Sequence, residues 1–142
     1  MRLSHARAAI TARFDDPNLV SCAGLVPVMA LADRCGLPIL LREQVKIAAK
    51  GGANAAVKIL TIVAGMVCGA DSIDDMDLLR HGGMPRLFGQ IRAPSTVGTF
   101  LRLFTFGHVR QLDAVAARLL PALAAAGANP ARHRPVHNRR HR

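Results

Sequence analysis

Alanine is the most frequent residue in this chain, at 24 of 142 positions, and it restricts the choice of fold more than any other feature. It has the highest helix propensity of all residues. Hydrophobic residues make up 51% of the chain, enough for a packed core, yet the aromatic residues are five Phe with no Tyr or Trp. Sandwiches, barrels and aromatic RNA-binding platforms depend on such rings. The composition therefore predicts a mainly α protein.

Apolar residues recur at helical spacing in segments that Gly, Pro or polar turns separate. The predicted helices cover residues 25–35, 38–46, 55–69, 95–104 and 108–126. Gly36 stands where a left-handed cap ends the first of these helices. The helix over 55–69 is apolar on nearly all sides, with Lys58 at its solvated end, so we expect it to be central and buried. Residues 23–130 are thus expected to form one small helical domain.

An acidic cluster follows the most apolar helix. Ser72 and Asp75 have the spacing of a capping box, and Asp71, Asp74 and Asp77 add negative charge where a helix N-terminus favours it. The alternative is a Mg²⁺ or Ca²⁺ site. Calcium loops need a Gly turn and a distal acid, and neither follows here. Capping is the interpretation that the spacing favours.

The two ends of the chain differ from its body. Turn-forming residues 15–18 separate two short apolar stretches, 6–14 and 19–22, which predicts an N-terminal arm over 1–22 with a short β-hairpin. Residues 131–142 contain Arg, His, Pro and Asn with one large apolar side chain, which predicts a disordered tail.

Positive charge is concentrated at those ends. The formal net charge is +10, of which residues 1–14 contribute +3 and residues 131–142 contribute +5. The body between them has 11 basic and 9 acidic residues. Such flanks attract polyanions, although a solvated basic tail without a dedicated partner has the same composition.

The sequence predicts no catalytic or metal centre. Cys22, Cys35 and Cys68 form no CxxC pair, so we expect small apolar residues in a reducing compartment, without disulfides or zinc. His133, His137 and His141 repeat every four residues, but Pro135 interrupts the helix that would align them. Ser, Cys and His lie in no catalytic motif, and Gly51-Gly52 lacks the Lys and Ser/Thr of a phosphate loop.

The hydropathy of the chain and its N-terminal residues indicate where in the cell the protein is located. The longest apolar run, residues 59–70, is shorter than the roughly 20 residues that a membrane span needs. No uninterrupted apolar segment of a secretory signal follows the N-terminal arginines. We therefore expect a cytoplasmic protein without a membrane partner.

Residues 95–104 and 108–126, joined by a turn with Gly107, resemble a helix-turn-helix pair. Hydroxyls and N–H groups at a helix N-terminus can bind phosphate oxygens, and Arg can bind a phosphate or a guanine edge. An ordinary helical hairpin with a solvated face is the alternative. The candidate DNA-binding residues on the polar side are Arg92, Ser95, Thr96, Thr99, Arg102 and Arg110.

Several segments also resemble a known family in collinear order over residues 3–125. They are residues 14–21 (FDDPNLVS), 23–29 (AGLVPVM), 63–67 (VAGMV), 69–82 (GADSIDDMDLLRHG), 93–102 (APSTVGTFLR) and 106–112 (FGHVRQL). They resemble the N-terminal part of actinobacterial DDE transposases, in particular the insertion-sequence 1380 family. The resemblance implies a helical region that binds transposon ends and assembles the synaptic complex.

In that family an RNase H-like domain follows, and its acidic triad binds Mg²⁺ or Mn²⁺ for strand cleavage and joining. No residue of this chain matches the triad, and Asp71, Asp74, Asp75 and Asp77 match the helical region instead. The resemblance ends near Gly127, which indicates a truncated transposase without catalytic residues or cofactor of its own. We expect it to be inactive alone and to bind transposon-end DNA, with itself or full-length transposase as a further partner.

Two other functions stay open from the sequence. The helical unit can serve protein–protein contact alone, such as transposase oligomerisation, while the basic tail binds polyanions without specificity. The product can also be poorly folded, with apolar surface exposed where a catalytic domain would pack.

Overall fold

The structure is a computed structural model that describes residues 16–128. Six α-helices and two 3₁₀ segments account for most of this range, and no residue within it forms a strand. The helices are α1 (Leu25–Arg34), α2 (Leu37–Gln44), α3 (Ala55–Val67), α4 (Met84–Leu87), α5 (Pro94–Leu101) and α6 (Phe106–Ala128), and the 3₁₀ segments are η2 (Lys50–Gly52) and η3 (Asp74–Arg80). The prediction of a mainly α protein is confirmed.

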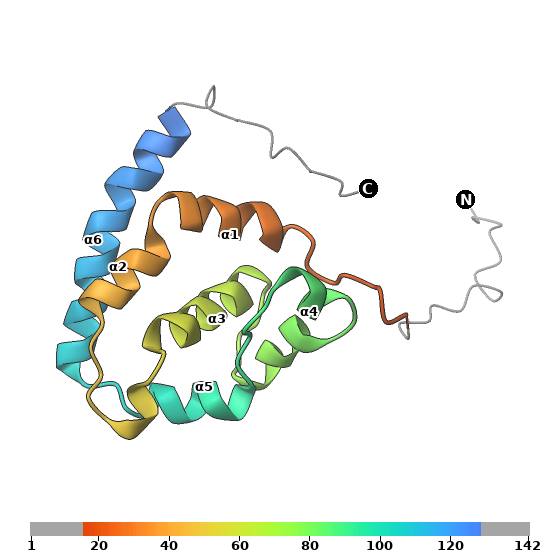
Figure 1. Cartoon of the computed structure of the whole chain (residues 1–142), viewed down its shortest axis with the longest axis horizontal. Coiled ribbons are helices and arrows are strands. Elements are labelled where there is room, and N and C mark those ends of the chain that lie inside the picture. Colours follow the sequence, from red (N-terminus) through yellow and green to blue (C-terminus); the bar gives the residue numbers. More distant parts are fainter. Residues whose placement is uncertain (1–15, 129–142) are drawn as a thin grey trace, which may run out of the picture.

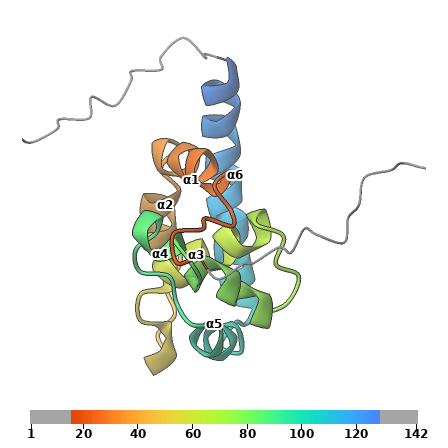
Figure 2. The same ribbon diagram turned by 90° about the vertical axis from the view of Figure 1, so that its right-hand side faces the viewer.

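Helix α3 lies in the middle, with α1 and α2 above it, α5 below it and α4 to its right in Figure 1. The long helix α6 runs along the outer side and packs chiefly on α2. Figure 2, turned by 90°, shows α6 extending past α1 at its C-terminal end. Both views place α3 where the other helices can cover it.

Two groups of buried side chains form the core, and α3 contributes to both. The first group joins α2, α3, α5 and α6, and its members are Leu37, Leu41, Val45, Ala55, Ala56, Ile59, Phe100 and Val115. The second group joins α1, the far end of α3, η3 and α4, and its members are Leu25, Ala64, Met76, Leu79 and Met84. Small residues on α3 let its neighbours approach closely: a Cβ on Gly65 would lie 2.2 Å from the Met76 sulfur.

The central position of α3 confirms one prediction, but two details were wrong. Lys58 is 8% exposed and does not mark a solvated end. Burial also ends before the helix does, because Met66 and Val67 are exposed. Gly69, with φ of +90°, follows α3 in the left-handed region, a conformation that commonly ends helices.

The N-terminal hairpin is not observed. The predicted turn is present, since the Asn18 N–H donates to the Asp16 carboxylate at 2.8 Å. Residues 19–22 form no strand, and the Leu19 carbonyl instead accepts one hydrogen bond from the Gly83 N–H at 2.8 Å. The facing stretch 6–14 and the tail 131–142, with its three histidines, lie outside the described residues.

The capping box is confirmed. The Asp75 carboxylate accepts hydrogen bonds from the Ser72 N–H at 3.1 Å and the Ser72 hydroxyl at 2.6 Å, and the Asp75 N–H donates back to the Ser72 oxygen. These bonds lower the pKa of Asp75 below its ordinary value. The segment that follows is the 3₁₀ helix η3, where an α-helix was expected.

The helix-turn-helix pair differs from its prediction in both bounds and packing. Helix α5 begins at Pro94, with Ala93 as its N-cap, and ends at Leu101, three residues before the predicted end at 104. Helix α6 begins at Phe106, because the Thr105 carbonyl accepts the His108 N–H, and His108 Nδ1 in turn accepts the Thr105 N–H at 3.1 Å. The two helices pack on different partners, α5 on α3, η2 and η3 and α6 on α2, so they are not a self-contained unit.

Candidate nucleic-acid interface

Three of the six predicted DNA-binding residues line one pocket. Ser95, Thr96 and Thr99 lie along one side of α5, and the pocket between them and η2 has a volume of about 290 Å³. Its other walls are Gly51, Lys58 and Phe100. The structure thus brings these three predicted residues to one pocket and adds Lys58 to them.

Lys58 is the one buried cation among residues 16–128. Its ammonium Nζ donates to the carbonyls of Gly51 and Ala53, both at 2.7 Å, and lies 5.2 Å from the centre of the Phe100 ring. Burial of a charge is costly unless hydrogen bonds satisfy it, and the two carbonyls supply that compensation. An ammonium has three N–H donors, so one remains. Lys58 therefore brings a positive charge to the lining of this pocket.

No carboxylate neutralises Lys58 in the described part of the chain, where the ion pair found joins Arg80 to Asp77. The position of Lys58 in the first turn of α3 adds to this positive potential, because a helix N-terminus is itself positive. The Lys58 charge, which no ion pair offsets in residues 16–128, and the helix N-terminus together favour an anion nearby.

Helix α5 presents its N-terminal polar groups on the same pocket. The N–H groups of Thr96 and Val97 bond the Ala93 carbonyl, and the Thr99 hydroxyl donates to the Ser95 carbonyl at 2.9 Å. Within residues 16–128, the side-chain hydroxyls of Ser95 and Thr96 have no such partner, and both residues are exposed. These two hydroxyls are the groups that α5 leaves available to a ligand.

The three predicted arginines lie outside the pocket. Arg92 is half-buried ahead of α5, its N–H donates to the Thr61 hydroxyl at 3.4 Å, and its Nε is buried without a hydrogen bond in the region described. Arg102 is exposed after the last residue of α5. Arg110 is exposed on α6, 6.0 Å from the centre of the Phe106 ring. Arg102 and Arg110 are therefore exposed to solvent and line no part of the pocket, while Arg92 belongs in part to the fold.

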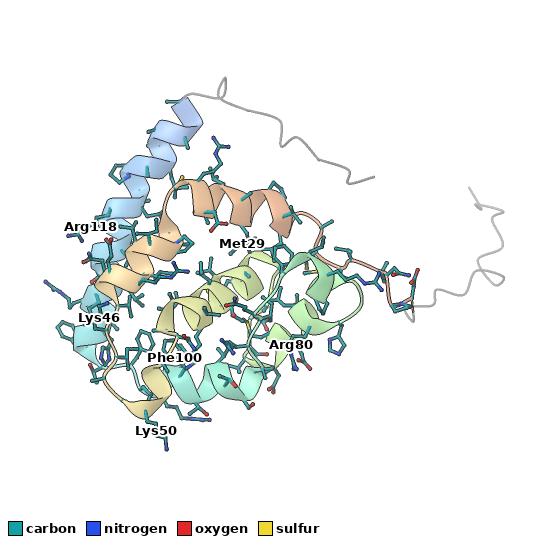
Figure 3. The ribbon with its side chains drawn as sticks, in the orientation of Figure 1. Met29, Lys46, Lys50, Arg80, Phe100 and Arg118 are labelled. Atoms are coloured by element: carbon teal, nitrogen blue, oxygen red, sulfur yellow. The ribbon has the colours of Figure 1, made fainter. Side chains whose placement is uncertain are left out.

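The sequence around α5 is basic, although α5 also packs on the acidic 3₁₀ segment η3. Residues 92–118 contain four arginines against one acid, Asp113, a net charge of +3. Figure 3 shows Phe100 between α3 and α5, and Lys50 projecting from the edge of the molecule at η2. The predicted acidic residues 71–77 lie on a different segment, η3 and the turn before it.

Lys58 and Gly51 are the residues of this site that sequence reasoning missed. A weak signal was present: Lys58 is a single cation in the first turn of an apolar helix, where a positive charge is unfavourable unless something compensates it. A Gly-rich turn precedes that helix, but the spacing gives no indication that the turn folds back over the ammonium.

A larger pocket of about 540 Å³ lies between α2 and the start of α3. It is lined by Arg42 and Lys46, but the Lys46 ammonium donates to the Arg42 carbonyl at 2.6 Å. None of the predicted DNA-binding residues lines it. The pocket at α5 is therefore the better candidate.

Neither a metal site nor a membrane-spanning helix is found within residues 16–128. No three His, Cys, Asp or Glu side chains gather there in an arrangement that could hold a metal ion. Within the same residues, none of the helices combines the length and the apolar character needed to cross a membrane.

Comparison with protein-family models, curated proteins and solved structures finds no match to this chain.

Proposed function

We propose that this chain is the DNA-contacting helical region of a transposase, and that it binds the phosphate backbone of duplex DNA at the α5 pocket. The observation that supports this most is Lys58, a buried cation without a carboxylate partner in the described chain, which lines the same pocket as three predicted DNA-binding residues. Phosphate contacts of this kind hold a protein on DNA without reading its sequence.

Each group in the pocket has a role in this proposal. The remaining Lys58 N–H and the Ser95 and Thr96 hydroxyls donate to phosphate oxygens, and the positive end of α5 favours the charge. Arg102 and Arg110 bind neighbouring phosphates or a base edge. The basic residues 131–142 add affinity that depends on salt and not on sequence.

The transposase part of the proposal concerns chemistry. On the basis of the family resemblance, we propose that the bound DNA is a transposon end, that the protein acts in the cytoplasm, and that a second transposase chain is a further partner. Strand cleavage would require three metal-binding carboxylates, and the proposal assigns none in this chain. The purified chain is therefore expected to leave plasmid DNA intact with Mg²⁺ or Mn²⁺.

The test separates binding from folding by one substitution in the pocket. Ser95→Asp places a negative charge where the phosphate would bind, yet an acid in the first turn of α5 stabilises that helix. We expect the affinity for a mixed-sequence duplex to fall by about tenfold or more, and the dependence on salt to weaken by about one phosphate contact. The thermal midpoint should stay the same or rise.

Ser21→Asp is the matched control, because Ser21 is exposed in the turn before α1 and the substitution changes the net charge equally. It should alter affinity by less than about threefold. Arg102→Ala and Arg110→Ala should each weaken binding, in contrast to Arg34→Ala on α1. Equal losses for Ser95→Asp and Ser21→Asp would contradict a phosphate site at α5.

A second function is favoured by exposed apolar side chains at the end of α3. Met66 is 66% exposed and, with Ile73 and Leu101, borders a largely apolar pocket of about 300 Å³. Such a patch suits contact with another protein surface, including a second transposase chain. Two results together would favour this function over the first. Replacement of the arginines of residues 131–142 by Gln would abolish DNA affinity, and Ser95→Asp would leave it unchanged.

A further inference from the structure

An apolar pocket lies where the end of α3 meets η3 and α5. Met66, Ile73 and Leu101 are exposed large hydrophobic residues, and all three line this pocket of about 300 Å³. Two buried side chains, Met76 and Val97, contribute to its apolar wall. Contact between such side chains and water is unfavourable, so a segment that covers the pocket would stabilise the fold.

The rim of the same pocket is acidic. Four of the nine acidic residues of the chain lie within residues 71–77, and they are Asp71, Asp74, Asp75 and Asp77. Asp71 lines the pocket itself, and both Asp71 and Asp74 are exposed. Within residues 16–128 the ion pair found in this region joins Asp77 to Arg80 and leaves Asp71 and Asp74 out. An occupant that suits this surface therefore combines apolar with basic side chains.

The N-terminal segment of the chain has that combination. Residues 1–14 carry three arginines and no acid, a net charge of +3. Their large apolar residues are Met1, Leu3, Ile10 and Phe14. Residues 131–142 have a net charge of +5 but a single large apolar side chain, so they match the acidic rim and not the apolar wall. Charge and hydrophobicity together select the N-terminal segment.

The first described residues lie beside the acidic segment. A Cβ on Gly82 would be 3.9 Å from the Asp16 carbonyl oxygen, and the Gly83 N–H donates to the Leu19 carbonyl at 2.8 Å. Figure 1 shows these residues on the side of the molecule where α4 lies. Since η3 ends at Arg80, the N-terminal segment joins the fold within two residues of the end of η3.

The segment is long enough to reach the pocket from that point. The 3₁₀ helix η3 has seven residues, and at a rise of about 2 Å per residue it is about 14 Å long. An extended chain covers at most about 3.3–3.6 Å per residue, so residues 1–14 span up to about 46–50 Å. Docking along η3 therefore requires no change in the described fold.

We propose that residues 1–14 fold back over the apolar pocket between α3, η3 and α5, with their arginines beside Asp71 and Asp74. Their apolar side chains cover Met66, Ile73 and Leu101. Exposed ion pairs each contribute little to stability, so the apolar contact supplies most of the stabilisation and the charges determine which end of the chain binds.

This inference does not rest on the proposed DNA site. Helix α5 contributes Val97 and Leu101 to the apolar pocket. Its residues in the proposed DNA site are Ser95, Thr96 and Thr99. At 3.6 residues per turn these two sets lie on opposite sides of α5, so the docked segment leaves the DNA site open. The same segment takes the surface that a second chain would otherwise use, and the oligomeric state distinguishes these two occupants.

The experiment is NMR spectroscopy of the full chain with ¹³C-labelled methionine methyl groups, at a concentration where sedimentation gives the mass of a monomer. We expect nuclear Overhauser contacts between the Met66 methyl group and side chains of Leu3, Ile10 or Phe14. These contacts should weaken as NaCl is raised from about 0.05 M to about 0.5 M, because salt screens the attraction between the arginines and the aspartates.

Two charge-matched pairs of substitutions identify the acidic rim as the partner. Asp71→Asn combined with Asp74→Asn removes two negative charges beside the pocket and should reduce the contacts by about half or more. Asp33→Asn combined with Asp113→Asn removes the same charge from exposed positions on α1 and α6, and it should leave the contacts unchanged. Both pairs keep the size of each side chain.

Three results would each overturn the proposal. The first is a monomer in which the Met66 methyl group has no contact with residues 1–14. The second is an equal loss of contacts in the two pairs of variants. The third is contacts that appear only at the mass of a dimer, which would assign the pocket to a second chain. Because the sample contains no DNA, a failure of the DNA site at α5 does not change any of these results.

Discussion

Replacement of Phe100 by Leu tests the packing that holds α5 in place. Phe100 is fully buried, with 0% exposure, in the core group that joins α2, α3, α5 and α6. Its ring lies 5.1 Å from the Phe104 ring at an interplanar angle of 86°, and the Lys58 ammonium is 5.2 Å from its centre. A leucine keeps an apolar side chain at this position but removes both ring interactions.

The expected loss follows from three contributions. The reduced apolar area costs about 1 kcal/mol, at roughly 0.8 kcal/mol per buried methylene. The edge-to-face pair contributes about 0.5–1.5 kcal/mol, and the cation–π contact about 0.5–2 kcal/mol. Phe100→Leu is therefore expected to lower the free energy of unfolding by about 2–4.5 kcal/mol, a large part of the stability of a small domain.

Phe106→Leu is the matched control, since the Phe106 side chain is 77% exposed at the start of α6. It should change the free energy of unfolding by no more than about 0.5 kcal/mol. Urea unfolding followed by far-UV circular dichroism measures both variants, with the slope on urea concentration expected to stay constant. Equal losses for the two variants, or a loss below about 1 kcal/mol for Phe100→Leu, would refute the placement of this ring.

Two further predictions concern other parts of the fold. Gly65→Ala should destabilise the protein by about 1–3 kcal/mol because its Cβ would lie 2.2 Å from the Met76 sulfur, whereas Gly89→Ala, with nothing within 4 Å, should be neutral or slightly stabilising in thermal melts. Ser72→Ala should raise the pKa of Asp75 toward the ordinary 3.8, because the bonds from Ser72 lower it in the folded chain. The stability that Asp75 contributes is present above its unfolded pKa and is lost as pH falls through the folded one, so carboxyl NMR titrations of the two proteins should differ at acidic pH.

Local sequence chemistry predicted those parts of the fold that local interactions determine. The end of α1 at a left-handed glycine, Gly36 with φ of 79°, follows from backbone sterics alone. The bonds between Ser72 and Asp75 likewise require only residues three apart. The start of α6 was misplaced although its signal is also local, because the Thr105–His108 bond is a capping pair with a histidine in place of the usual acid or amide.

The features that sequence reasoning missed depend on contacts between distant residues. Periodicity placed Lys58 on a helix, but not under the Gly51 and Ala53 carbonyls that let it be buried. The three cysteines were interpreted as small apolar residues, and nothing in their spacing shows that Cys22 and Cys68 pack against the same core group. In the candidate site, the α5 hydroxyls could be grouped from the sequence because residues one turn apart share a face of a helix. The opposite wall of the pocket comes from another segment, so its residues could not be found in this way.

The central claim is that duplex DNA binds at the α5 pocket, and the most direct measurement is the change in backbone amide NMR shifts when a mixed-sequence duplex is added to the full chain. The account predicts that the amides of Gly51, Ser95, Thr96 and Thr99 shift together with increasing DNA, and that added salt reverses these changes. Shifts restricted to residues 131–142, with the amides around the pocket unchanged at saturating DNA, would contradict it.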